Sequence, residues 1–583
     1  MKRSVSDNAR RVLESRYLRR DRQGRILEDA EGLFRRVAGA VAAAEGGWGG
    51  PEEMRYWEEL FFETMSQGLF LPNSPTLMNA GTPLSQLSAC FVLPVPDSME
   101  GIFDSLKQAA LIQQSGGGTG FNFSRLRPRN DLISKTGGTA SGPVSFMKIF
   151  DAATEYVKQG GKRRGANMGI LRVDHPDILE FIDVKREPGI LRNFNISVAI
   201  PDPFMQAVEA NLAWTLRHPG SGEAVQTLQA RDIWDRIVEN AWAGGDPGMI
   251  FLDTINAANP TPELGFLDAT NPCGEVPLLP YEACNLGSLN LARFVKTVDG
   301  RAAIDWDELN TVIRIAVRFL DDVIEVNNYL FTDIQRIVRG NRKIGLGVMG
   351  WADLLCLLEI PYASGEAITL ADKLMQFIEA ASTEASAGLA LQRGTFPNWE
   401  RSIFYPNRPL RNATRTSIAP TGTISILADT SSSIEPIFAL AFERQHILHG
   451  ETLATIHPFV LDYLHRTGEY TPALEDQIRS QGTLQGYPGL SDRTRSLFRT
   501  ALEIDPVWHL RHQVAFQHHV DNAVSKTINL PREATVKEVA AIYFQAWKLG
   551  AKGITVYRQF SRSGQVLQPG LQTGDRACRV CPA

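Results

Sequence analysis

The feature that most constrains the fold is an alternation of short apolar runs with long amphipathic stretches after about residue 70. The runs are bounded by Gly, Pro, Asn and Ser, and they include ACFVLPV (89–95), NFNISVAI (193–200), KIGLGVMG (343–350) and RTSIAPTGTISIL (415–427). Between them lie helical patterns such as residues 307–330. Strands that alternate with helices are typical of α/β folds with parallel strand pairing. The sequence therefore predicts an α/β fold.

The spacing of apolar residues and the local composition divide the chain into three regions. Residues 1–70 repeat apolar positions at three- and four-residue spacing and are predicted to be helical. Residues 71–558 contain no clear linker and no internal repeat, so we expect one large α/β unit. Residues 559–583 are polar with scattered glycine, and they are predicted to form a flexible tail that carries Cys578 and Cys581.

Composition excludes several classes of protein. The net charge is −5 over 583 residues without a basic block, which argues against nucleic acid as a partner. No apolar run approaches the roughly 20 residues that span a bilayer, and the start lacks the apolar core of a secretory signal. We therefore expect no membrane partner and a cytoplasmic location. Six cysteines are too few for a disulfide framework, so paired ones are expected to be catalytic or metal-binding. Cys356, in the apolar run ADLLCLLEI, is predicted to be a core residue.

The most informative short stretch is NPCGE, from Asn271 to Glu275. Asn-Pro and Gly274 are turn signals, so this segment is predicted to be a loop tip where three polar side chains converge. A nearby carboxylate discourages a thiolate at Cys273, and the loop has no His or Lys to activate a two-electron nucleophile. The residues fit a thiol that loses a hydrogen atom while Glu275 and Asn271 manage substrate hydroxyl protons. Taken alone, the loop is also explained by a buried structural cysteine, which is the commoner case.

Nine motifs in a fixed order carry a resemblance to a known family. They are NSPTLMNAG (73–81), SACFVLPVPDSMEGIF (88–103), GGGTGFNFSRLRP (116–128), GGKRRGANMGIL (160–171), NPCGE (271–275), RKIGLGVMGWAD (342–353), APTGTISILADTSSSIEP (419–436), DNAVSKTINLP (521–531) and GAKGITVYR (550–558). Each is weak by itself, but the ordered set is specific. Over nearly its whole length the chain resembles ribonucleotide reductases, and among them the adenosylcobalamin-dependent class II.

The resemblance implies a role for each residue of the catalytic set. Cys273 matches the cysteine that becomes a thiyl radical and removes the 3′ hydrogen of the ribose. Glu275 matches the carboxylate that takes the 3′ hydroxyl proton, and Asn271 matches the amide that hydrogen-bonds the substrate hydroxyls. Cys90 and Cys284 match the pair that delivers two electrons and closes into a disulfide.

The segment SIAPTGTIS (417–425) is predicted to hold the substrate phosphates. Helix N-termini bind anions through their backbone N–H groups, and a proline suits the first turn. By itself the segment is more simply an ordinary Thr-capped helix, but it matches the substrate-phosphate segment of the family. The Gly-rich QSGGGTGF (114–121) fits no phosphate-loop pattern and is predicted to be a close-packed turn. The predicted substrate-binding residues are Thr76, Ala89, Pro420, Thr421, Gly422, Thr423 and Ser425.

A second nucleotide site is implied by two further matches. Asp97 matches a residue at the site where family members bind a deoxynucleoside triphosphate effector. The loop 158–169 matches the segment that links effector to substrate, and its Lys162, Arg163 and Arg164 are predicted to meet phosphate or base. A basic Gly-rich loop is by itself most often a solvated turn, and coupling between two sites is a free-energy linkage that a sequence does not display.

The C-terminal motif GITVYR favours one radical source. A class I large subunit receives the radical through two adjacent tyrosines, whereas here Tyr557 follows Val556. The stretch does not resemble a glycyl-radical loop either, so adenosylcobalamin is the predicted cofactor. The Asp-x-His-x-x-Gly signature of base-off cobalamin enzymes is absent, because His465 in DYLHRTG stands one place too late. No residue of the chain is therefore predicted to ligate a metal.

The resemblance implies a ten-stranded α/β barrel of two antiparallel five-stranded halves around a central finger loop. It implies reduction of ribonucleotides, with diphosphates favoured, to 2′-deoxyribonucleotides for DNA synthesis. Expected partners are the ribonucleotide, a dNTP effector, a second copy of the chain as a homodimer, and a thioredoxin-like reductant that acts through Cys578 and Cys581. Three alternatives stay open: a class I-like large subunit that needs a radical-generating subunit, a non-catalytic nucleotide-binding regulator, and a zinc site at the tail cysteines.

Overall fold

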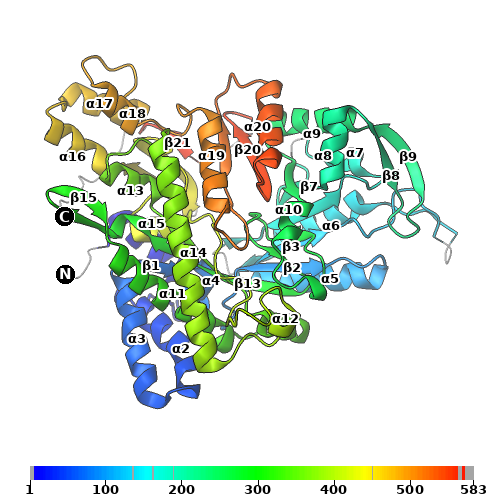
Figure 1. Ribbon diagram of the computed structural model, residues 1–583, viewed down its shortest axis with the longest axis horizontal. Helices are drawn as coiled ribbons and strands as arrows, with labels where there is room; N and C mark the ends of the chain where they lie inside the picture. The colour runs from blue at the N-terminus through cyan, green and yellow to red at the C-terminus, as the bar shows by residue number, and fades with distance from the viewer. Residues whose placement is uncertain are drawn as a thin grey trace.

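The computed structural model of the chain describes residues 5–133, 137–159, 163–187, 189–448, 451–561 and 567–571. Its centre is a ten-stranded sheet with the order β1-β13-β2-β3-β6-β7-β10-β20-β19 and β16 paired to β13 (Figure 1). These strands are β1 (Phe70–Pro72), β2 (Cys90–Pro94), β3 (Gly118–Asn122), β6 (Asn167–Arg172), β7 (Phe194–Ile200), β10 (Gly248–Phe251), β13 (Glu282–Asn290), β16 (Ile344–Met349), β19 (Thr527–Leu530) and β20 (Gly553–Arg558).

Two sets of parallel strands run in opposite directions. One set is β2, β3, β6, β7 and β10. The other contains the parallel pairs β13–β16 and β19–β20, and the antiparallel pairs β13–β2 and β10–β20 join the two sets. Single parallel bridges from Leu346 to Thr416 and from Ile418 to Val524 close the sheet into a barrel. The predicted ten-stranded barrel of two antiparallel halves is confirmed: the second half consists of β13, β16, the irregular segment 416–418, β19 and β20. Strand β1 is an additional strand that pairs antiparallel with β13.

Glycines allow this irregular segment to lie unusually close to β16. A Cβ atom at Gly347 would lie 2.3 Å from the Ser417 carbonyl oxygen, and one at Gly345 would lie 2.8 Å from the Ser417 Cβ. Both distances are shorter than any side chain tolerates. The glycine spacing in KIGLGVMG is therefore a requirement of barrel closure.

Helices cover the outside of the barrel. The crossover helices of the first half are α5 (Met99–Gln114), α6 (Pro143–Tyr156), α7 (Ile178–Asp183), α8 (Asp202–Ala210) and α9 (Ala230–Gly244). The others are α1 (Asp7–Val12), α2 (Ala30–Ala42), α3 (Gly50–Ser66), α4 (Ser74–Asn79), α10 (Leu252–Ala257), α11 (Trp306–Val326), α12 (Thr332–Asn341), α13 (Trp351–Leu357), α14 (Gly365–Arg393), α15 (Ile424–Ala428), α16 (Pro458–Thr467), α17 (Pro472–Gln481), α18 (Asp492–Leu497), α19 (Pro506–Gln517) and α20 (Val536–Lys548).

Short strands form separate two- and three-stranded sheets. They are β4 (Lys158–Gln159), β5 (Arg163–Arg164), β8 (Ala213–Arg217), β9 (Ala224–Gln229), β11 (Ala269–Thr270), β12 (Pro277–Leu278), β14 (Val295–Val298), β15 (Arg301–Ile304), β17 (Ala441–Leu448), β18 (Glu451–Ile456) and β21 (Leu567–Pro569).

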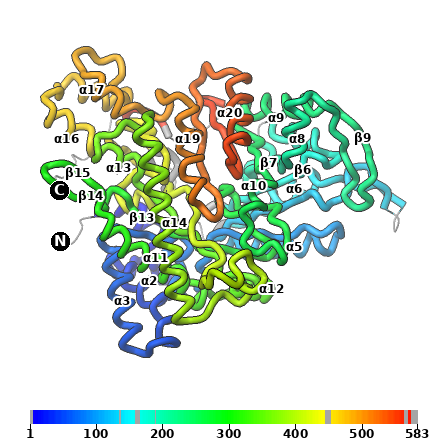
Figure 2. The backbone as a smooth tube through the Cα atoms, in the orientation of Figure 1, coloured from blue at the N-terminus to red at the C-terminus, as the bar shows by residue number. Residues whose placement is uncertain are grey.

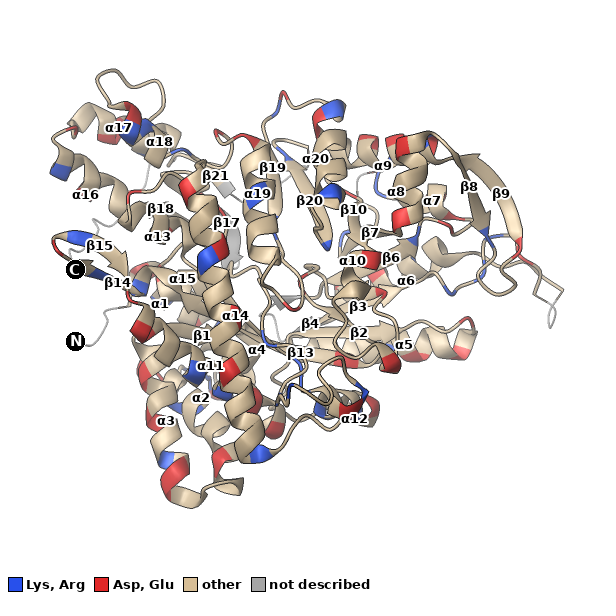
Figure 3. Ribbon diagram, viewed as in Figure 1, with Lys and Arg blue, Asp and Glu red and all other residues tan. Residues whose placement is uncertain are grey.

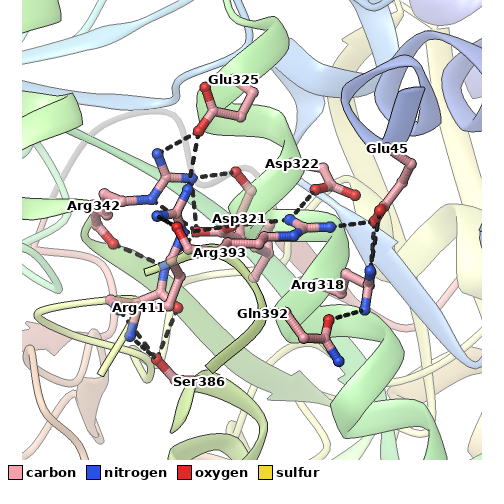
Figure 4. Close-up of polar contacts among 12 residues, drawn as sticks. Glu45, Arg318, Asp321, Asp322, Glu325, Arg342, Ser386, Gln392, Arg393 and Arg411 are labelled. Atoms are coloured by element: carbon pink, nitrogen blue, oxygen red, sulfur yellow. Dashed lines mark hydrogen bonds and ion pairs between the residues drawn. The ribbon is translucent and has the colours of Figure 1, made fainter. Parts of the chain in front are cut away.

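The N-terminal region is helical, as the apolar spacing predicts. Asp29 begins α2 by accepting a hydrogen bond from Gly32 N, and the apolar residues of α2 turn inward. Helices α2 and α3 pack on each other and on α11, and they form the lower left part of the molecule in Figure 1. Glu45, in the turn after α2, reaches Arg318 on α11 and Arg393 at the end of α14 (Figure 4). The helical region is therefore joined to the barrel by buried ion pairs as well as by apolar contacts.

The C-terminal part of the chain returns to the barrel and then leaves it. The strand register places β20 beside β10, about 300 residues earlier in the chain. In Figure 2 the red C-terminal part of the chain accordingly lies next to the green part near β7 and α10. After β20, residues 567–569 pair with β17, which belongs to an outer unit that also contains β18 and α16–α18. The prediction of a flexible tail from residue 559 is therefore wrong for residues 567–571, because backbone hydrogen bonds attach them. Cys578 and Cys581 lie outside the described residues.

Charge is concentrated on the outer helices. Figure 3 shows Lys, Arg, Asp and Glu scattered along α3, α9 and α14, while the central strands β2 and β3 carry almost none. A separate observation concerns membranes: no helix in the part of the chain that the structure describes is long and apolar enough to cross one.

Candidate active site

A cavity of about 290 Å³ lies inside the barrel, around the tip of the loop 271–275. Its wall also includes the start of α4, the start of β2, the end of α5, the middle of β13 and the segment before α15. Among the described residues that line it, Glu275 is the only charged side chain. The predicted site residues in the wall are Ala89, Cys90, Asn271, Cys273, Glu275, Pro420, Thr421, Gly422 and Thr423.

The loop 271–275 is a finger that the hairpin of β11 and β12 carries into the barrel. Its neighbour β3 must be glycine-rich, because a Cβ at Gly120 would lie 1.7 Å from the Thr270 carbonyl oxygen and one at Gly118 would lie 2.8 Å from Pro272 Cγ. The close packing predicted for QSGGGTGF is confirmed, although its last residues form strand β3. At the tip, Gly274 has φ of +84°, a conformation that favours glycine.

Asn271 and Glu275 meet Cys90 at the base of the finger. Asn271 Nδ2 lies 3.2 Å from Cys90 Sγ, and the Asn271 Oδ1 accepts a hydrogen bond from Val276 N at 3.1 Å. Cys90 Sγ lies 3.9 Å from Glu275 Oε1. Cys90, Asn271 and Glu275 are all buried, whereas Cys273 at the tip is exposed. The thiol of Cys273 is therefore accessible from the cavity, whereas the buried thiol of Cys90 lies beside the carboxylate.

Cys284 lies directly opposite Cys90, on the antiparallel neighbour β13. Opposite residues in such a pair have Cα atoms about 4.5–5.5 Å apart, which is within the range that a disulfide needs. Both cysteines are reduced thiols here, and burial raises the pKa of Cys284. Its Sγ donates to the carbonyl oxygens of Asn285 at 3.3 Å and Lys343 at 3.7 Å. The register thus joins two cysteines that are 194 positions apart in the sequence. Cys356 is buried in a separate apolar cluster, as predicted.

The predicted phosphate segment lines the cavity, but its helix begins later than expected. Helix α15 starts at Ile424 and has only five residues, so Pro420 precedes the helix and does not occupy its first turn. The Thr421 hydroxyl does not cap the helix. It accepts a hydrogen bond from Ser433 N at 2.7 Å and lies 3.3 Å from Ser432 Oγ.

Two predicted substrate-binding residues are not part of the cavity lining. Thr76 is fully buried, and its hydroxyl donates to the Leu87 carbonyl oxygen at 3.0 Å and lies 3.2 Å from Asn73 Oδ1. Ser425 is also fully buried within α15. Neighbours of Thr76, namely Ser74 and Pro75, form the wall instead. Both residues therefore lie behind the lining.

The predicted effector residues lie along α5, outside the cavity. Asp97 stands just before this helix and pairs with Arg127 at 2.8 Å, which raises the pKa of Arg127. Arg163 and Arg164 form strand β5 of a hairpin that packs against α5 through β4. Lys162 lies outside the described residues. The hairpin is followed by Gly165 and Ala166, which line the cavity, so one continuous segment connects α5 with the cavity wall.

Gln113, at the end of α5, was not predicted and lines the cavity beside the glycine run. Its Nε2 donates to Thr119 Oγ1 at 3.0 Å and to Asn167 Oδ1 at 2.7 Å. The sequence signal for it is a polar residue on the inward face of an amphipathic helix, directly before Gly116–Gly118.

The residues considered for radical transfer and cobalt binding lie elsewhere. Tyr557 is on β20, opposite Asn529. His465 is exposed on α16 in the outer unit, where its ring stacks on Tyr470 at 3.8 Å. Within the part of the chain that the structure describes, no group of three or more His, Cys, Asp or Glu side chains could hold a metal ion.

Comparison with known proteins identifies the fold. Residues 88–557 match the model of the ribonucleotide reductase barrel domain, and residues 3–85 match that of the ribonucleotide reductase all-alpha domain. The chain belongs to the ribonucleotide reductase family.

Individual relatives extend over most of this reductase chain. It is 52% identical to the vitamin B12-dependent ribonucleoside-diphosphate reductase of Mycobacterium tuberculosis (strain CDC 1551 / Oshkosh) over 557 residues, which are 95% of this chain and 80% of that protein. It is 47% identical to the protein of the same name from Thermoplasma acidophilum, over 97% of this chain and 80% of that one. The class Id ribonucleotide reductase alpha subunit of Actinobacillus ureae has the same fold, with a TM-score of 0.77, 24% identity and coverage of 95% and 97% of the two chains.

Proposed function

We propose that this chain reduces ribonucleoside diphosphates to 2′-deoxyribonucleoside diphosphates by thiyl-radical chemistry, with adenosylcobalamin as the radical source. The observation that carries the proposal is that Asn271, Cys273, Glu275 and Cys90 line one nearly uncharged cavity, with Cys284 directly opposite Cys90 on the neighbouring strand. A nucleotide-binding regulator needs no such redox set. The relatives named as vitamin B12-dependent ribonucleoside-diphosphate reductases support both the diphosphate substrate and the cofactor.

In the proposed reaction the exposed Cys273 acts first. Its thiyl sulfur takes the hydrogen atom from C3′ of the ribose, so that an S–H bond forms and the C3′–H bond breaks. Glu275 takes the proton of the 3′ hydroxyl, and Asn271 holds the substrate hydroxyls by hydrogen bonds. At the end Cys273 returns its hydrogen to C3′. This cysteine is therefore a carrier and is not consumed.

Cys90 and Cys284 supply the reducing equivalents. The 2′ oxygen leaves as water, C2′ gains a hydrogen, and the two thiols give up two electrons and two protons as they form one disulfide. The short path from Cys90 Sγ to Glu275 Oε1, 3.9 Å, supports proton exchange between the thiol and the carboxylate. Burial raises the pKa of Cys284, which keeps this thiol protonated until it reacts.

The arrangement of cysteines at the cavity suits a radical that is generated by a bound cofactor. Cys273 is the exposed thiol, while Cys90 and Cys284 are buried, so an external group meets Cys273 first. Adenosylcobalamin, when bound, supplies a carbon radical by homolysis of its cobalt–carbon bond. Apart from Cys273 and Cys90, the described residues that line the cavity include no Cys, Met, Tyr or Trp side chain that would compete for the radical.

We also propose a homodimer with an effector site beside it. Helices α5 and α6 pack on each other, and each exposes apolar side chains at helical spacing. These are Met99, Phe103 and Leu111 on α5 and Ile149 and Tyr156 on α6. A second copy of the same helix pair would cover these side chains. Asp97 precedes α5 and the hairpin with Arg163 and Arg164 packs against it, so we propose these three residues as the binding groups for a deoxynucleoside triphosphate. Loss of the dimer in Phe103→Glu, measured by light scattering, is the expected test result.

The disulfide must be reduced after each turnover, and we assign this step to Cys578 and Cys581. They would pass electrons from a thioredoxin-like protein in the cytoplasm, where thiols stay reduced. Cys578→Ser/Cys581→Ser is expected to stop after about one turnover with thioredoxin but to continue with a small dithiol. Loss with both reductants would indicate the alternative, a structural zinc site.

The deciding experiment is an anaerobic assay of the purified chain with a ribonucleoside diphosphate and a small dithiol. Deoxynucleotide is expected when adenosylcobalamin is present and absent when it is omitted, without any second protein. Activity only after addition of a separate radical-generating subunit would contradict the assignment and support the class I-like alternative.

A further inference from the structure

The cavity wall at Thr421 is supported from behind by the loop 430–433. Ser433 N donates to Thr421 Oγ1 at 2.7 Å, and Ser432 Oγ lies 3.3 Å from the same oxygen. Thr421 is 1% exposed, so its hydroxyl is held by the protein rather than by solvent. The position of the segment that lines the cavity therefore depends on where the loop 430–433 is fixed.

Asp353, in the first turn of α13, fixes that loop. Its Oδ2 accepts hydrogen bonds from Thr430 Oγ1 and from Ser431 N, each at 2.7 Å, and its own backbone N–H donates to Ser431 Oγ at 3.2 Å. The fit is close, because a Cβ at Gly350 would lie 2.5 Å from Thr430 Oγ1. Asp353 is 2% exposed, and a buried carboxylate with several donors makes strong, directional bonds.

His457 completes the arrangement from the outer unit. Its Nε2 lies 3.1 Å from Asp353 Oδ1, and its backbone N–H donates to the Leu440 carbonyl oxygen at 2.8 Å. This residue stands at the N-terminus of α16, which packs against α13. The carboxylate thus connects three parts of the chain: α13, the loop 430–433 and the outer unit.

We propose that Asp353 is a positioning residue for the substrate phosphates, with His457 orienting its carboxylate. This inference rests on the proposed function and deepens it, since it assigns the residue that holds the phosphate segment in place. Asp353 lies outside the cavity lining and acts through the loop 430–433 and Thr421. Rigid backbone N–H groups at 421–424 bind a diphosphate better than mobile ones, because binding then costs less conformational entropy.

The test is equilibrium binding of CDP and of cytidine to Asp353→Asn, with no cofactor present. The amide keeps the shape of the side chain but loses its charge, which weakens its hydrogen bonds to Thr430 and Ser431. The affinity for CDP is therefore expected to fall about tenfold, which corresponds to the free energy of one charge-assisted hydrogen bond. Affinity for cytidine is expected to change less than about twofold, because the base and ribose contacts remain. In turnover assays KM for CDP rises while kcat at saturation stays nearly constant. Asp476→Asn, which makes the same change at an exposed carboxylate on α17, is the matched control.

A second variant keeps the proposal testable if Asp353→Asn folds poorly. His457→Asn leaves the carboxylate and its bonds to Thr430 and Ser431 in place, and it is expected to weaken CDP binding about threefold. His465→Asn, an exposed histidine on α16, is its control. Unchanged CDP affinity in both variants, or equal losses for CDP and cytidine, would overturn the inference. Failure of the unaltered chain to bind CDP would instead contradict the proposed function.

Discussion

Two buried polar regions of this reductase differ sharply in charge. The cavity has one charged side chain, Glu275, among its described lining residues. The second region lies between the N-terminal helices and the barrel, where four carboxylates and four guanidinium groups form a continuous network (Figure 4). Its members are Glu45, Asp321, Asp322, Glu325, Arg318, Arg342, Arg393 and Arg411, with ion-pair distances from 2.5 to 3.3 Å.

The pKa values of the two buried aspartates in the network are shifted in opposite directions. Burial would raise the pKa of Asp321, but Arg342, Arg411 and Arg393 outweigh burial and lower it. Burial raises the pKa of Asp322 well above its usual range, since Arg393 compensates only in part and Glu45 is close. Neither residue lines the cavity. The carboxylates with shifted pKa values here mark a structural joint, whereas the described lining of the proposed radical site has one charged side chain.

The largest expected effect is a loss of turnover without a loss of stability, and it comes from a substitution at the cavity. Cys273→Ala is expected to lower deoxynucleotide formation at least about 10⁴-fold, because no other exposed thiol stands at the finger tip. The free energy of unfolding should change by less than about 1 kcal/mol, since an exposed side chain makes few packing contacts. Turnover and denaturant unfolding measure the two quantities. Residual turnover above about a tenth of normal would remove Cys273 from the mechanism.

Cys284→Ser tests the redox pair at the same site. The variant is expected to retain exchange of hydrogen between adenosylcobalamin and water through Cys273, but to lose product at least about 10³-fold because no disulfide can form. Tritium release from the labelled cofactor and product analysis distinguish the two steps. Normal product yield would show that Cys90 and Cys284 are not the electron source.

In the charged region, Arg393→Met is expected to destabilise the protein by about 3–5 kcal/mol, because it removes the buried ion-pair partner of Asp322 and one of the partners of Glu45 and of Asp321. Arg314→Met is the control, since Arg314 pairs with Glu384 at 2.9 Å on the surface and should contribute less than about 1 kcal/mol. Denaturant titration measures both. Equal effects would mean that the network is not the joint between the helical region and the barrel.

A smaller effect is expected from the pH dependence of the stability that Asp321 contributes. The lowered pKa of Asp321 means that its contribution is present above the unfolded value of about 4 and is lost as pH falls through the folded value. Asp321→Asn should therefore cost about 1.5–3 kcal/mol at pH 7, and this difference should shrink as the pH drops below about 4. Unfolding curves at several pH values check this. A difference that is independent of pH would indicate a packing effect of the substitution.

Several features of this protein were set by the sequence alone. The α/β class, the helical N-terminus, the tight packing of the glycine run and the core position of Cys356 follow from periodicity and turn chemistry, which are local. Asn271 and Glu275 both reach Cys90 while Cys273 stands at the exposed tip, because Pro272 and Gly274 form a turn within five residues. The same short range explains why NPCGE stands out in the amino-acid sequence.

Other features were decided only by the tertiary structure. The register of β2 against β13 places Cys90 opposite Cys284, and no spacing rule predicts that pairing. Thr76 and Ser425 have suitable hydroxyls, but both are buried outside the cavity lining. Helix α15 begins only at Ile424, and the Thr421 hydroxyl is held by the loop 430–433. The Asp353–His457 contact and the ion network depend on side chains from distant segments. Such contacts are fixed by the closure of the barrel, because only closure sets the distances between residues far apart in the chain.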